Sequence, residues 1–410
     1  MYRKVSYRFF VLCCIMISFF CTSTLKSFAM ATPFLQTTKT VYSTGEAIPI
    51  YFYNGPGNPS DWIGIYRDGD PDRNYLDWMY VNNTQAPFQG YKNGMVILKG
   101  RLEPGTYDLR FFANNGYVKI SPDIKITVTK EKGNLSPDCP INIMTMNTWN
   151  SGQNVNDGIN KIINAITMSS ADIVGFQEIS DQVKIVSERL GWHYYRNIIS
   201  RYPIVEGFET TGAGARVRLP SGQEVLVVST HLDASKYGPY EALFECKSVS
   251  TLIQQENTIR GVGVTAILNK IQAYLASNMP VFLVGDFNAP SHLDWTQSTQ
   301  DLHDGYIIEW PVSKKIEQEG MLDSYRTKYP NPVINPGNTW SPVFTRAHPY
   351  DPRYPYEPQD RIDFIYTKGR VQVLNSQEFL VGTPKEYGQH QFNEWPSDHR
   401  AVVSQFILNP

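Results

Sequence analysis

The chain has 410 residues with 37 basic and 39 acidic side chains, so its formal net charge is −2. Residues 1–31 hold four basic and no acidic side chains, and without them 33 basic residues would face 39 acidic ones, a charge near −6. Binding to long nucleic acids through many phosphates requires a basic stripe, and the sequence has none. The composition therefore disfavours long polyanions as partners, although bound cations could screen a local site.

Residues 1–31 are typical of a secretory signal peptide. Basic residues precede an apolar run from Phe9 to Cys21, and the segment ends at Ala29-Met30-Ala31. The run has about 13 residues, fewer than the roughly 20 that span a bilayer. We therefore expect a cleaved signal and a secreted, extracellular protein without a transmembrane segment.

Short β-type runs separated by Gly and Pro turns follow the predicted signal. They predict an all-β sandwich domain over residues 33–130. Residues 131–137 are polar and rich in breakers, so we place a linker there. The predicted strands are Ile48–Tyr53, Trp62–Tyr66, Met95–Lys99, Thr106–Phe112 and Ile124–Val128.

The pattern changes after the linker to apolar strands that alternate with amphipathic helices, which is typical of a layered α/β domain. Isoleucines recur at helical spacing from Ile159 to Ile166. Because the mature chain exceeds what one hydrophobic core usually serves, we predict a second domain over residues 138–410. Its predicted strands include Ile141–Met146, Ile173–Phe176, Val225–Ser229, Val281–Val284 and Phe364–Tyr366.

Polar residues follow four of these strands at the point where each strand ends. Any one of them alone would be read as a turn or capping residue. The coincidence at four strands, repeated near the C-terminus, instead predicts a functional site assembled at strand ends. The residues are Asn147, Glu178, His231, Asp286 and Asn288, with Asp363, Asp398 and His399 near the C-terminus.

Seven short motifs contain these residues: Thr145-Met146-Asn147, Phe176-Gln177-Glu178-Ile179, Ser200-Arg201-Tyr202-Pro203-Ile204, Ser229-Thr230-His231-Leu232-Asp233, Gly285-Asp286-Phe287-Asn288, Arg361-Ile362-Asp363-Phe364-Ile365 and Ser397-Asp398-His399. Their order resembles the endonuclease/exonuclease/phosphatase superfamily of deoxyribonuclease-I-like nucleases, apurinic endonucleases, bacterial sphingomyelinases and inositol-polyphosphate 5-phosphatases. The resemblance covers roughly residues 137–410. It implies an α/β (α+β) four-layer sandwich, in which two packed β-sheets are flanked by helices.

The resemblance also implies a divalent metal. Asn147, Glu178 and Asp398 would supply its oxygen ligands, which suit Mg²⁺ or Mn²⁺ better than zinc, with Ca²⁺ as a further candidate. The metal would polarise the phosphoryl group and take up developing charge.

The remaining motif residues would act on the substrate and on water. Asp363 would orient His399, which takes a proton from water or, when charged, donates to phosphoryl oxygens. Asp286 would activate or position the attacking water, Asn288 would hold the phosphate, and His231 would stabilise its oxygens or assist the leaving group. Alternatively, His399 is a surface residue and Asp363 an ion-pair partner of Arg361, but the other motifs would then be unexplained.

Two loops bear on substrate choice, which loops around a shared centre make in such folds. Residues 234–250 follow His231 and are expected to form a rim in which Tyr237 and Tyr240 stack on the substrate. Arg361 is also a candidate for substrate binding. Residues 338–358 are rich in aromatic residues, and these side chains either grip a substrate or simply pack the loop.

The N-terminal segments Asp61-Trp62-Ile63-Gly64-Ile65-Tyr66-Arg67, Tyr75-Leu76-Asp77-Trp78 and Gly105-Thr106-Tyr107 resemble the SKICH-type, immunoglobulin-like β-sandwich. The resemblance implies accessory targeting or structural support without catalytic residues. Cys139 and Cys246 are the two cysteines beyond the signal. An exported compartment permits a disulfide between them, and free thiols are an equal alternative.

These features together predict a secreted, metal-dependent phosphoesterase that acts on a phosphodiester of the phospholipid-headgroup or nucleotide type. Its partners would be that phosphoester, with a lipid surface or a nucleotide as the candidates. The alternatives are a nuclease or a phosphomonoesterase on the same scaffold. A non-catalytic binding protein is a remote third reading, because the motif set is complete.

Overall fold

The computed structural model describes residues 32–37, 39–44, 48–87, 90–98, 102–129, 140–346 and 354–408. The predicted signal peptide, the linker 131–137 and Cys139 lie outside these residues, so the predictions that concern them stay predictions. Cys246 is exposed and has no disulfide partner among the described residues. Among the described helices, none combines the length and the apolar character that a membrane crossing requires.

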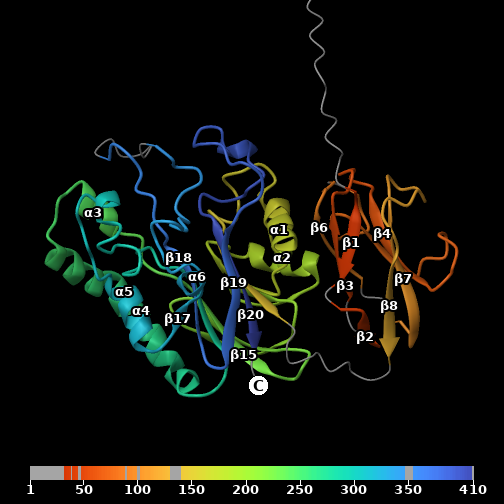
Figure 1. Cartoon of the computed structure of the whole chain (residues 1–410), viewed down its shortest axis with the longest axis horizontal. Helices are drawn as coiled ribbons and strands as arrows, with labels where there is room; N and C mark the ends of the chain where they lie inside the picture. The colour runs from red at the N-terminus through yellow and green to blue at the C-terminus, as the bar shows by residue number, and fades with distance from the viewer. Residues whose placement is uncertain are drawn as a thin grey trace, which may run out of the picture.

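The N-terminal part consists of two β-sheets that pack face to face (Figure 1). A three-stranded sheet has the order β1-β3-β6 and a five-stranded sheet the order β2-β8-β7-β4-β5. The inward residues of both sheets, such as Ile63 and Leu109, form one apolar core. The strands are β1 (Phe34–Thr37), β2 (Val41–Ser43), β3 (Ile48–Tyr53), β4 (Trp62–Arg67), β5 (Asp77–Tyr80), β6 (Gly94–Leu98), β7 (Gly105–Phe112) and β8 (Ile124–Thr129).

All five strands predicted in this part are confirmed, each to within one residue at either end. The strands β1, β2 and β5 were not predicted. β1 and β2 are only four and three residues long, and β5 begins at Asp77 with three half-buried residues. Such short or partly exposed strands lack the alternation on which strand prediction depends.

The C-terminal part contains two six-stranded sheets. The first has the order β11-β12-β10-β9-β20-β19 and the second the order β13-β14-β15-β16-β18-β17. The first sheet contains β9 (Ile141–Asn147), β10 (Ile173–Gln177), β11 (His193–Tyr195), β12 (Ile198–Ser200), β19 (Val371–Phe379) and β20 (Ala401–Leu408). The second contains β13 (Ile204–Glu209), β14 (Ala213–Arg218), β15 (Glu224–His231), β16 (Val281–Asp286), β17 (Leu322–Asp323) and β18 (Asp363–Lys368).

Helices cover the outer faces of both sheets, while an apolar core fills the space between them. The amphipathic helix α1 buries Ile162 and Ile166 on the first sheet, and α4 buries Ile267 and Ile271 on the second. The four layers confirm the predicted α/β sandwich. The helices are α1 (Gly158–Ser169), α2 (Gln182–Leu190), α3 (Gly238–Leu243), α4 (Val249–Leu275), α5 (Pro311–Gln318) and α6 (Ser324–Lys328), with 3₁₀ turns at Gln300–Leu302 and His390–Phe392.

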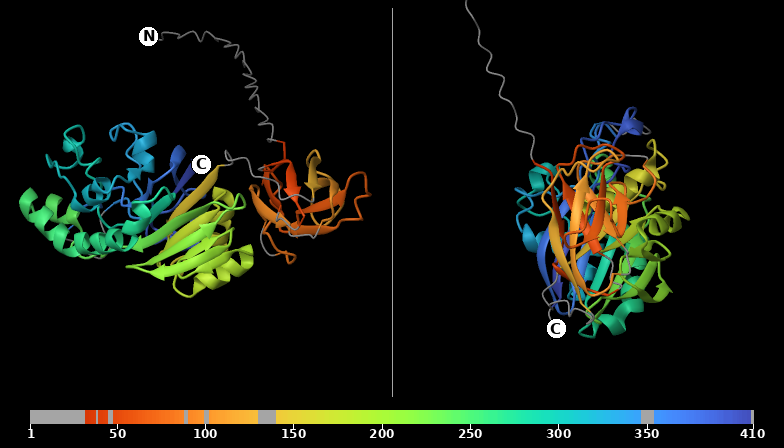
Figure 2. Two further views of the ribbon diagram at one scale, coloured as in Figure 1. Left: turned by 90° about the horizontal axis from the view of Figure 1, so that it is seen from below. Right: turned by 90° about the vertical axis from the view of Figure 1, so that its right-hand side faces the viewer.

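The N-terminal sheets pack against the first sheet's helical layer. Tyr51, Met95 and Ile97 are buried in the same apolar cluster as residues of α1 and α2. Figure 2 shows the N-terminal strands on one side of the C-terminal part and α4 on the opposite side. One motif residue takes part in this contact, because Arg201 lies 3.0 Å from the sulfur of Met95.

Candidate active site

Three of the predicted site residues lie in a row across neighbouring strands of the second sheet. His231 of β15 is paired with Asp286 of β16, and Asp286 is paired with Asp363 of β18. β15 and β16 are parallel, whereas β18 is antiparallel to β16. The carboxyl ends of two strands and the amino end of a third therefore present their side chains at the same edge of the sheet.

The first sheet supplies the other half of the site at the ends of β9 and β10. Asn147 ends β9 and is paired with Gln177 of β10, which Glu178 follows directly. The buried Asn147 amide joins the two sheets: its Nδ2 donates to Glu178 Oε1 at 3.2 Å and to Asp286 Oδ2 at 3.1 Å. Two carboxylates from different sheets thus share one amide group.

Glu178 presents its carboxylate to solvent from an unusual backbone conformation. Its φ is 59°, in the left-handed region that residues other than glycine seldom adopt. Its Oε2 accepts a 2.7 Å hydrogen bond from the backbone nitrogen of Asn150. Asn288 also has a positive φ, 49°. Backbone strain of this kind concentrates at functional sites, where the surrounding structure maintains it.

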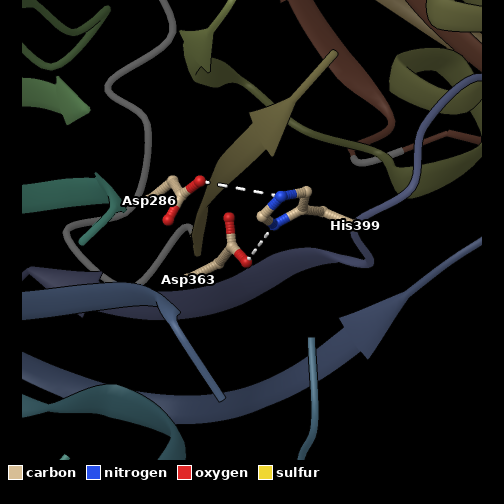
Figure 3. Close-up of side chains that lie close together, drawn as sticks. All are labelled: Asp286, Asp363 and His399. Atoms are coloured by element: carbon tan, nitrogen blue, oxygen red, sulfur yellow. Dashed lines mark hydrogen bonds and ion pairs between the residues drawn. The ribbon is translucent and has the colours of Figure 1, made fainter. Parts of the chain in front are cut away.

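His399 lies between two buried carboxylates (Figure 3). Its Nδ1 is 2.9 Å from Asp363 Oδ2, and its Nε2 is 3.7 Å from Asp286 Oδ2. The backbone nitrogen of Asp363 donates to the hydroxyl of Thr339, while Trp395 Nε1 donates to the carbonyl of His399 at 2.6 Å. The imidazole ring is therefore fixed from its backbone and through Nδ1, while its Nε2 faces the Asp286 carboxylate.

The charges of this cluster shift one another's pKa values. Burial alone would lower the pKa of His399, but the Asp363 and Asp286 carboxylates raise it to about 10. Burial would raise the pKa of Asp286, but the His399 and His231 imidazoles hold it at about 2. In the protein alone, His399 is therefore an imidazolium and Asp286 a carboxylate at neutral pH.

The remaining predicted residues surround this pair. His231 Nε2 is 3.4 Å from Asp286 Oδ2, and the imidazole stays partly exposed. Although burial lowers the pKa of His231, its hydrogen bond to Asp286 raises it above the ordinary value. Asn288 donates from its backbone to Asp286 Oδ1 and from its side chain to the carbonyl of Leu232, both at 2.9 Å. Burial, together with the Glu178 and Asp286 charges, raises the pKa of Asp398 to about 7 against the lowering effect of His399.

The donor set fits a divalent cation. Four carboxylates, those of Glu178, Asp286, Asp363 and Asp398, face the imidazoles of His231 and His399. Ligand atoms of Asp286, Asp363 and His399 lie within 4.8 Å of one another, and Asp363 Oδ1 has no hydrogen-bond partner among the described residues. Hard carboxylate oxygens in excess of positive charge are what Mg²⁺ and similar cations require. Because this close group differs from the predicted ligands Asn147, Glu178 and Asp398, that ligand set stays a prediction.

Arg361 lies apart from the cluster. It is 2% exposed, and its guanidinium forms ion pairs with Asp323 at 2.6 Å and with Asp294 at 2.8 Å. These contacts correct the prediction that Arg361 binds substrate, because its donors are already paired inside the fold. They also exclude Arg361 as the ion-pair partner of Asp363, which is bonded to His399 instead.

Tyr237 and Tyr240 are also engaged within the protein. The buried Tyr237 donates its hydroxyl hydrogen to Asp360 Oδ2 at 3.1 Å, which corrects the prediction that its ring stacks on a substrate. Tyr240 donates to Glu357 Oε1 at 2.6 Å, and one face of its ring is stacked on Tyr354. The aromatic residues of both loops therefore pack against one another in the region that the structure describes.

Sequence reasoning did not assign three residues that contact the catalytic cluster. Thr339 binds the backbone of Asp363, Trp395 binds that of His399, and Trp340 lies against the His399 ring. Trp340 was noted only as one member of an aromatic loop. No local pattern in the sequence indicates Thr339 or Trp395, because each contacts a residue at least four positions away along the chain.

Comparisons with known proteins agree with this architecture. The model of the Endonuclease/Exonuclease/phosphatase family matches residues 144–399. A protein of Caenorhabditis elegans, described as uncharacterized protein F14F9.5, is 36% identical over 293 residues, which cover 65% of this chain and 91% of that protein.

Two solved structures are also similar. An endonuclease/exonuclease/phosphatase family protein from Bacteroides thetaiotaomicron is 17% identical with a TM-score of 0.40, and the match covers 67% of this chain and 99% of that one. A variant of the 3′ phosphatase NExo from Neisseria, bound to a product DNA hairpin, is 19% identical with a TM-score of 0.41, over 64% of this chain and 98% of that one.

Proposed function

Because the chain belongs to the endonuclease/exonuclease/phosphatase family, we propose that it is a secreted, divalent-metal-dependent phosphodiesterase that cleaves its substrate by attack of water. We propose a substrate of the phospholipid-headgroup or nucleotide type. The observation that carries the proposal is the His399 imidazole between Asp363 and Asp286, inside a cluster of four carboxylates. A strand end with a purely structural role would not gather these carboxylates, because like charges in a largely buried site repel one another.

Glu178, Asn147 and Asp398 would hold the cation, with Asp286 beside them. A bound divalent cation would polarise the phosphoryl group and offset the negative charge that develops on it. The shared amide of Asn147 keeps the carboxylates of Glu178 and Asp286 on the same side of the site. These residues would thereby place the phosphoester beside the strand ends of both sheets.

His399 acts on the phosphoryl oxygens in this mechanism. Its Nδ1 proton is held by Asp363, so the Nε2 proton of the imidazolium is the one available to substrate. A fixed cationic donor stabilises the charge that builds up on the phosphoryl oxygens without reorganising during the reaction. Asp363 acts through His399 by fixing its ring and its charge.

Asp286 and His231 act on the water and on the leaving group. With a pKa of about 2, Asp286 is ionised and accepts a hydrogen bond that orients the water. Such an acidic group is a weak base, so its main contribution is to position the water. The partly exposed His231, whose pKa is raised by Asp286, is placed to donate a proton to the leaving oxygen.

Hydrolysis of bis-p-nitrophenyl phosphate by the purified protein tests the proposal. We expect turnover with Mg²⁺ or Mn²⁺, loss of turnover in excess EDTA, and recovery when the cation is restored. Sphingomyelin, plasmid DNA and p-nitrophenyl phosphate then separate a lipid phosphodiesterase, a nuclease and a phosphomonoesterase. If none of these esters is hydrolysed with Mg²⁺, Mn²⁺ or Ca²⁺, the enzymatic proposal is wrong.

A further inference from the structure

The half-buried indole ring of Trp340 packs against the His399 imidazole. The two ring centroids are 4.8 Å apart at an angle of 57°. The backbone of Trp340 forms isolated antiparallel bridges with both Asp360 and His399. Trp340 is therefore tied to the segment that carries His399 and to the segment that leads into β18 and Asp363.

A single carboxylate oxygen holds the outer end of this indole. Glu357 Oε1 accepts a 2.6 Å hydrogen bond from Trp340 Nε1 and another of 2.6 Å from the hydroxyl of Tyr240. Glu357 is 3% exposed, and its other oxygen has no hydrogen-bond partner among the described residues. A buried carboxylate bonded only to neutral donors is costly to fold. The simplest explanation for such a costly group is that its geometry serves a function.

The neighbouring Asp360 repeats this arrangement. Its two carboxylate oxygens accept hydrogen bonds from Trp295 Nε1 at 2.8 Å and from the Tyr237 hydroxyl at 3.1 Å. Its backbone exchanges hydrogen bonds with that of Trp340 at 3.0 and 3.1 Å. Tyr237 and Tyr240 both belong to the short segment of α3 and its N-cap. One short helix thus anchors the backbone and the side chain of Trp340 through two carboxylates.

We propose that Glu357 is a positioning residue for His399, which it serves by holding the Trp340 indole against the imidazole through the shared hydrogen bonds with Tyr240. The proposal rests on the proposed function of the site. Asp363 fixes the imidazole through Nδ1, whereas the indole blocks rotation of the ring away from Asp286. Without its hydrogen bond to Glu357, the Trp340 side chain loses the polar contact that fixes its outer end.

This role differs from direct contact between Trp340 or Tyr240 and the substrate. A residue that contacts the substrate equally in the ground and transition states changes KM when it is removed. Removing a residue that only holds His399 in place lowers kcat and leaves KM nearly unchanged. The split between these constants therefore separates a positioning role from a rim role.

The variants Glu357→Ala and Glu357→Gln test the proposal with bis-p-nitrophenyl phosphate and Mg²⁺. For the alanine variant we expect kcat to fall about 10- to 100-fold, because small displacements of catalytic groups cost this much. The amide oxygen of glutamine can accept both hydrogen bonds, and the glutamine side chain is close in size to that of glutamate. The glutamine variant should therefore recover most of the lost kcat. The exposed Glu309→Ala serves as the matched control, with wild-type kinetics expected.

A double-mutant cycle tests whether Glu357 acts through Trp340. Trp340→Phe keeps a ring beside His399 but lacks the donor, so we expect a reduced kcat. Adding Glu357→Ala to Trp340→Phe should cause little further loss, because the hydrogen bond is already absent. Independent, multiplying losses in the double variant, or a loss confined to KM, would overturn the proposal.

A readout without substrate separates this proposal from the proposed function. The His399 ring protons lie in the ring current of Trp340, so their NMR signals should shift in Glu357→Ala and stay in place in Glu357→Gln. Unchanged signals in a folded alanine variant show that Glu357 does not position the ring, whatever the activity. If the alanine variant fails to fold, Trp340→Phe and Glu357→Gln decide the question, since both retain the packing. A wild-type protein that hydrolyses no ester refutes the proposed function and thereby the catalytic part of this inference, and the signals then report on the geometry alone.

Discussion

His399 is the residue on which the proposed chemistry depends most. It is bonded to Asp363, lies near Asp286 and is fixed by Trp395 through its backbone carbonyl. We expect His399→Ala to lower kcat/KM by about 10²- to 10⁴-fold, the usual contribution of a positioned proton donor or acceptor. Steady-state hydrolysis of bis-p-nitrophenyl phosphate measures the effect, and circular dichroism verifies the fold.

His193 offers a matched control, because it is an exposed histidine at the start of β11. His193→Ala should keep wild-type kinetics. Near wild-type turnover by a folded His399→Ala protein would show that His399 has another role.

Glu178 is expected to act through the metal. It is exposed at the mouth of the site, where its carboxylate is held by Asn147 and by the Asn150 backbone. Removing one hard oxygen ligand weakens Mg²⁺ binding, so Glu178→Ala should abolish turnover at low Mg²⁺. Measuring rate against Mg²⁺ concentration tests this, and the midpoint should rise by at least about tenfold, a loss of roughly 1.4 kcal/mol. An unchanged midpoint together with wild-type turnover would remove Glu178 from the metal site.

The sequence was informative for residues whose chemistry conflicts with their place in the chain. Asp286 and Asn147 end buried strands, where a fold alone needs no carboxylate or amide, and this made them visible as site residues. Arg361 belongs to a motif but pairs with Asp294 and Asp323. Those partners are 67 and 38 residues away, so no local pattern indicates the ion pairs.

At the scale of elements, a buried ion cluster joins β17, α6 and the start of β18. Arg361 and Arg326 share Asp294, and Arg361 also pairs with Asp323. Arg361→Met would leave Asp323 without its paired cation in the interior, which typically costs about 3–5 kcal/mol. Urea unfolding measures the loss. Arg370→Met, at an exposed position, should change the free energy of unfolding little, and equal effects of the two variants would contradict the buried cluster.

Glu357 and Asp360 make the segment before β18 sensitive to pH. Burial raises the pKa of Glu357 to about 7 and that of Asp360 to about 6. The folded protein therefore binds more protons than the unfolded chain between the ordinary carboxyl pKa and these values, so stability falls as pH rises through that range.

Glu357→Gln tests this linkage. We expect the melting temperature of the wild type to fall between about pH 5 and pH 7.5 by more than that of the glutamine variant, which cannot ionise there. Thermal unfolding in EDTA across this range measures both proteins without a contribution from bound metal. Parallel curves would show that Glu357 does not titrate in this window.

Elements with a clear apolar pattern were predicted, whereas the 27-residue helix α4 and the strands β19 and β20 were not. β3 and β4 alternate or run apolar for six residues, and α1 repeats isoleucine at helical spacing. The helix α3 was expected only as a rim loop, because six residues beginning with Gly238-Pro239 carry no periodic signal. Its value lies in the tertiary contacts of Tyr237 and Tyr240, which local sequence does not encode.

At the scale of the whole molecule, the two parts of the chain share a buried apolar surface. Tyr51, Met95 and Ile97 are each less than 8% exposed and belong to one cluster with Ile163 and Ile166 of α1. The sequence predicted two domains but carried no sign that one completes the core of the other. Contacts between residues so far apart follow from the assembled fold and not from a local pattern.

This shared surface predicts that the C-terminal part depends on the N-terminal sheets for stability. A chain that begins at residue 140 exposes the face of α1 that Ile97 and Met95 cover. Each Å² of apolar surface left exposed lowers the free energy of unfolding by about 25 cal/mol. We expect this shorter chain to melt at a lower temperature than the full protein and to bind an apolar dye.

Ile97→Asp in the full chain isolates the interface from the effects of truncation. It places a charge in the apolar cluster and should lower the melting temperature, whereas Val118→Asp, at a residue 69% exposed, should not. The interface lies away from the catalytic residues at the strand ends. Hydrolysis at low temperature should therefore persist in the shorter chain and in Ile97→Asp, provided that His399 and its partners stay in place. Equal melting temperatures for the shorter chain and the full protein would mean that the sheets are an independent appendage.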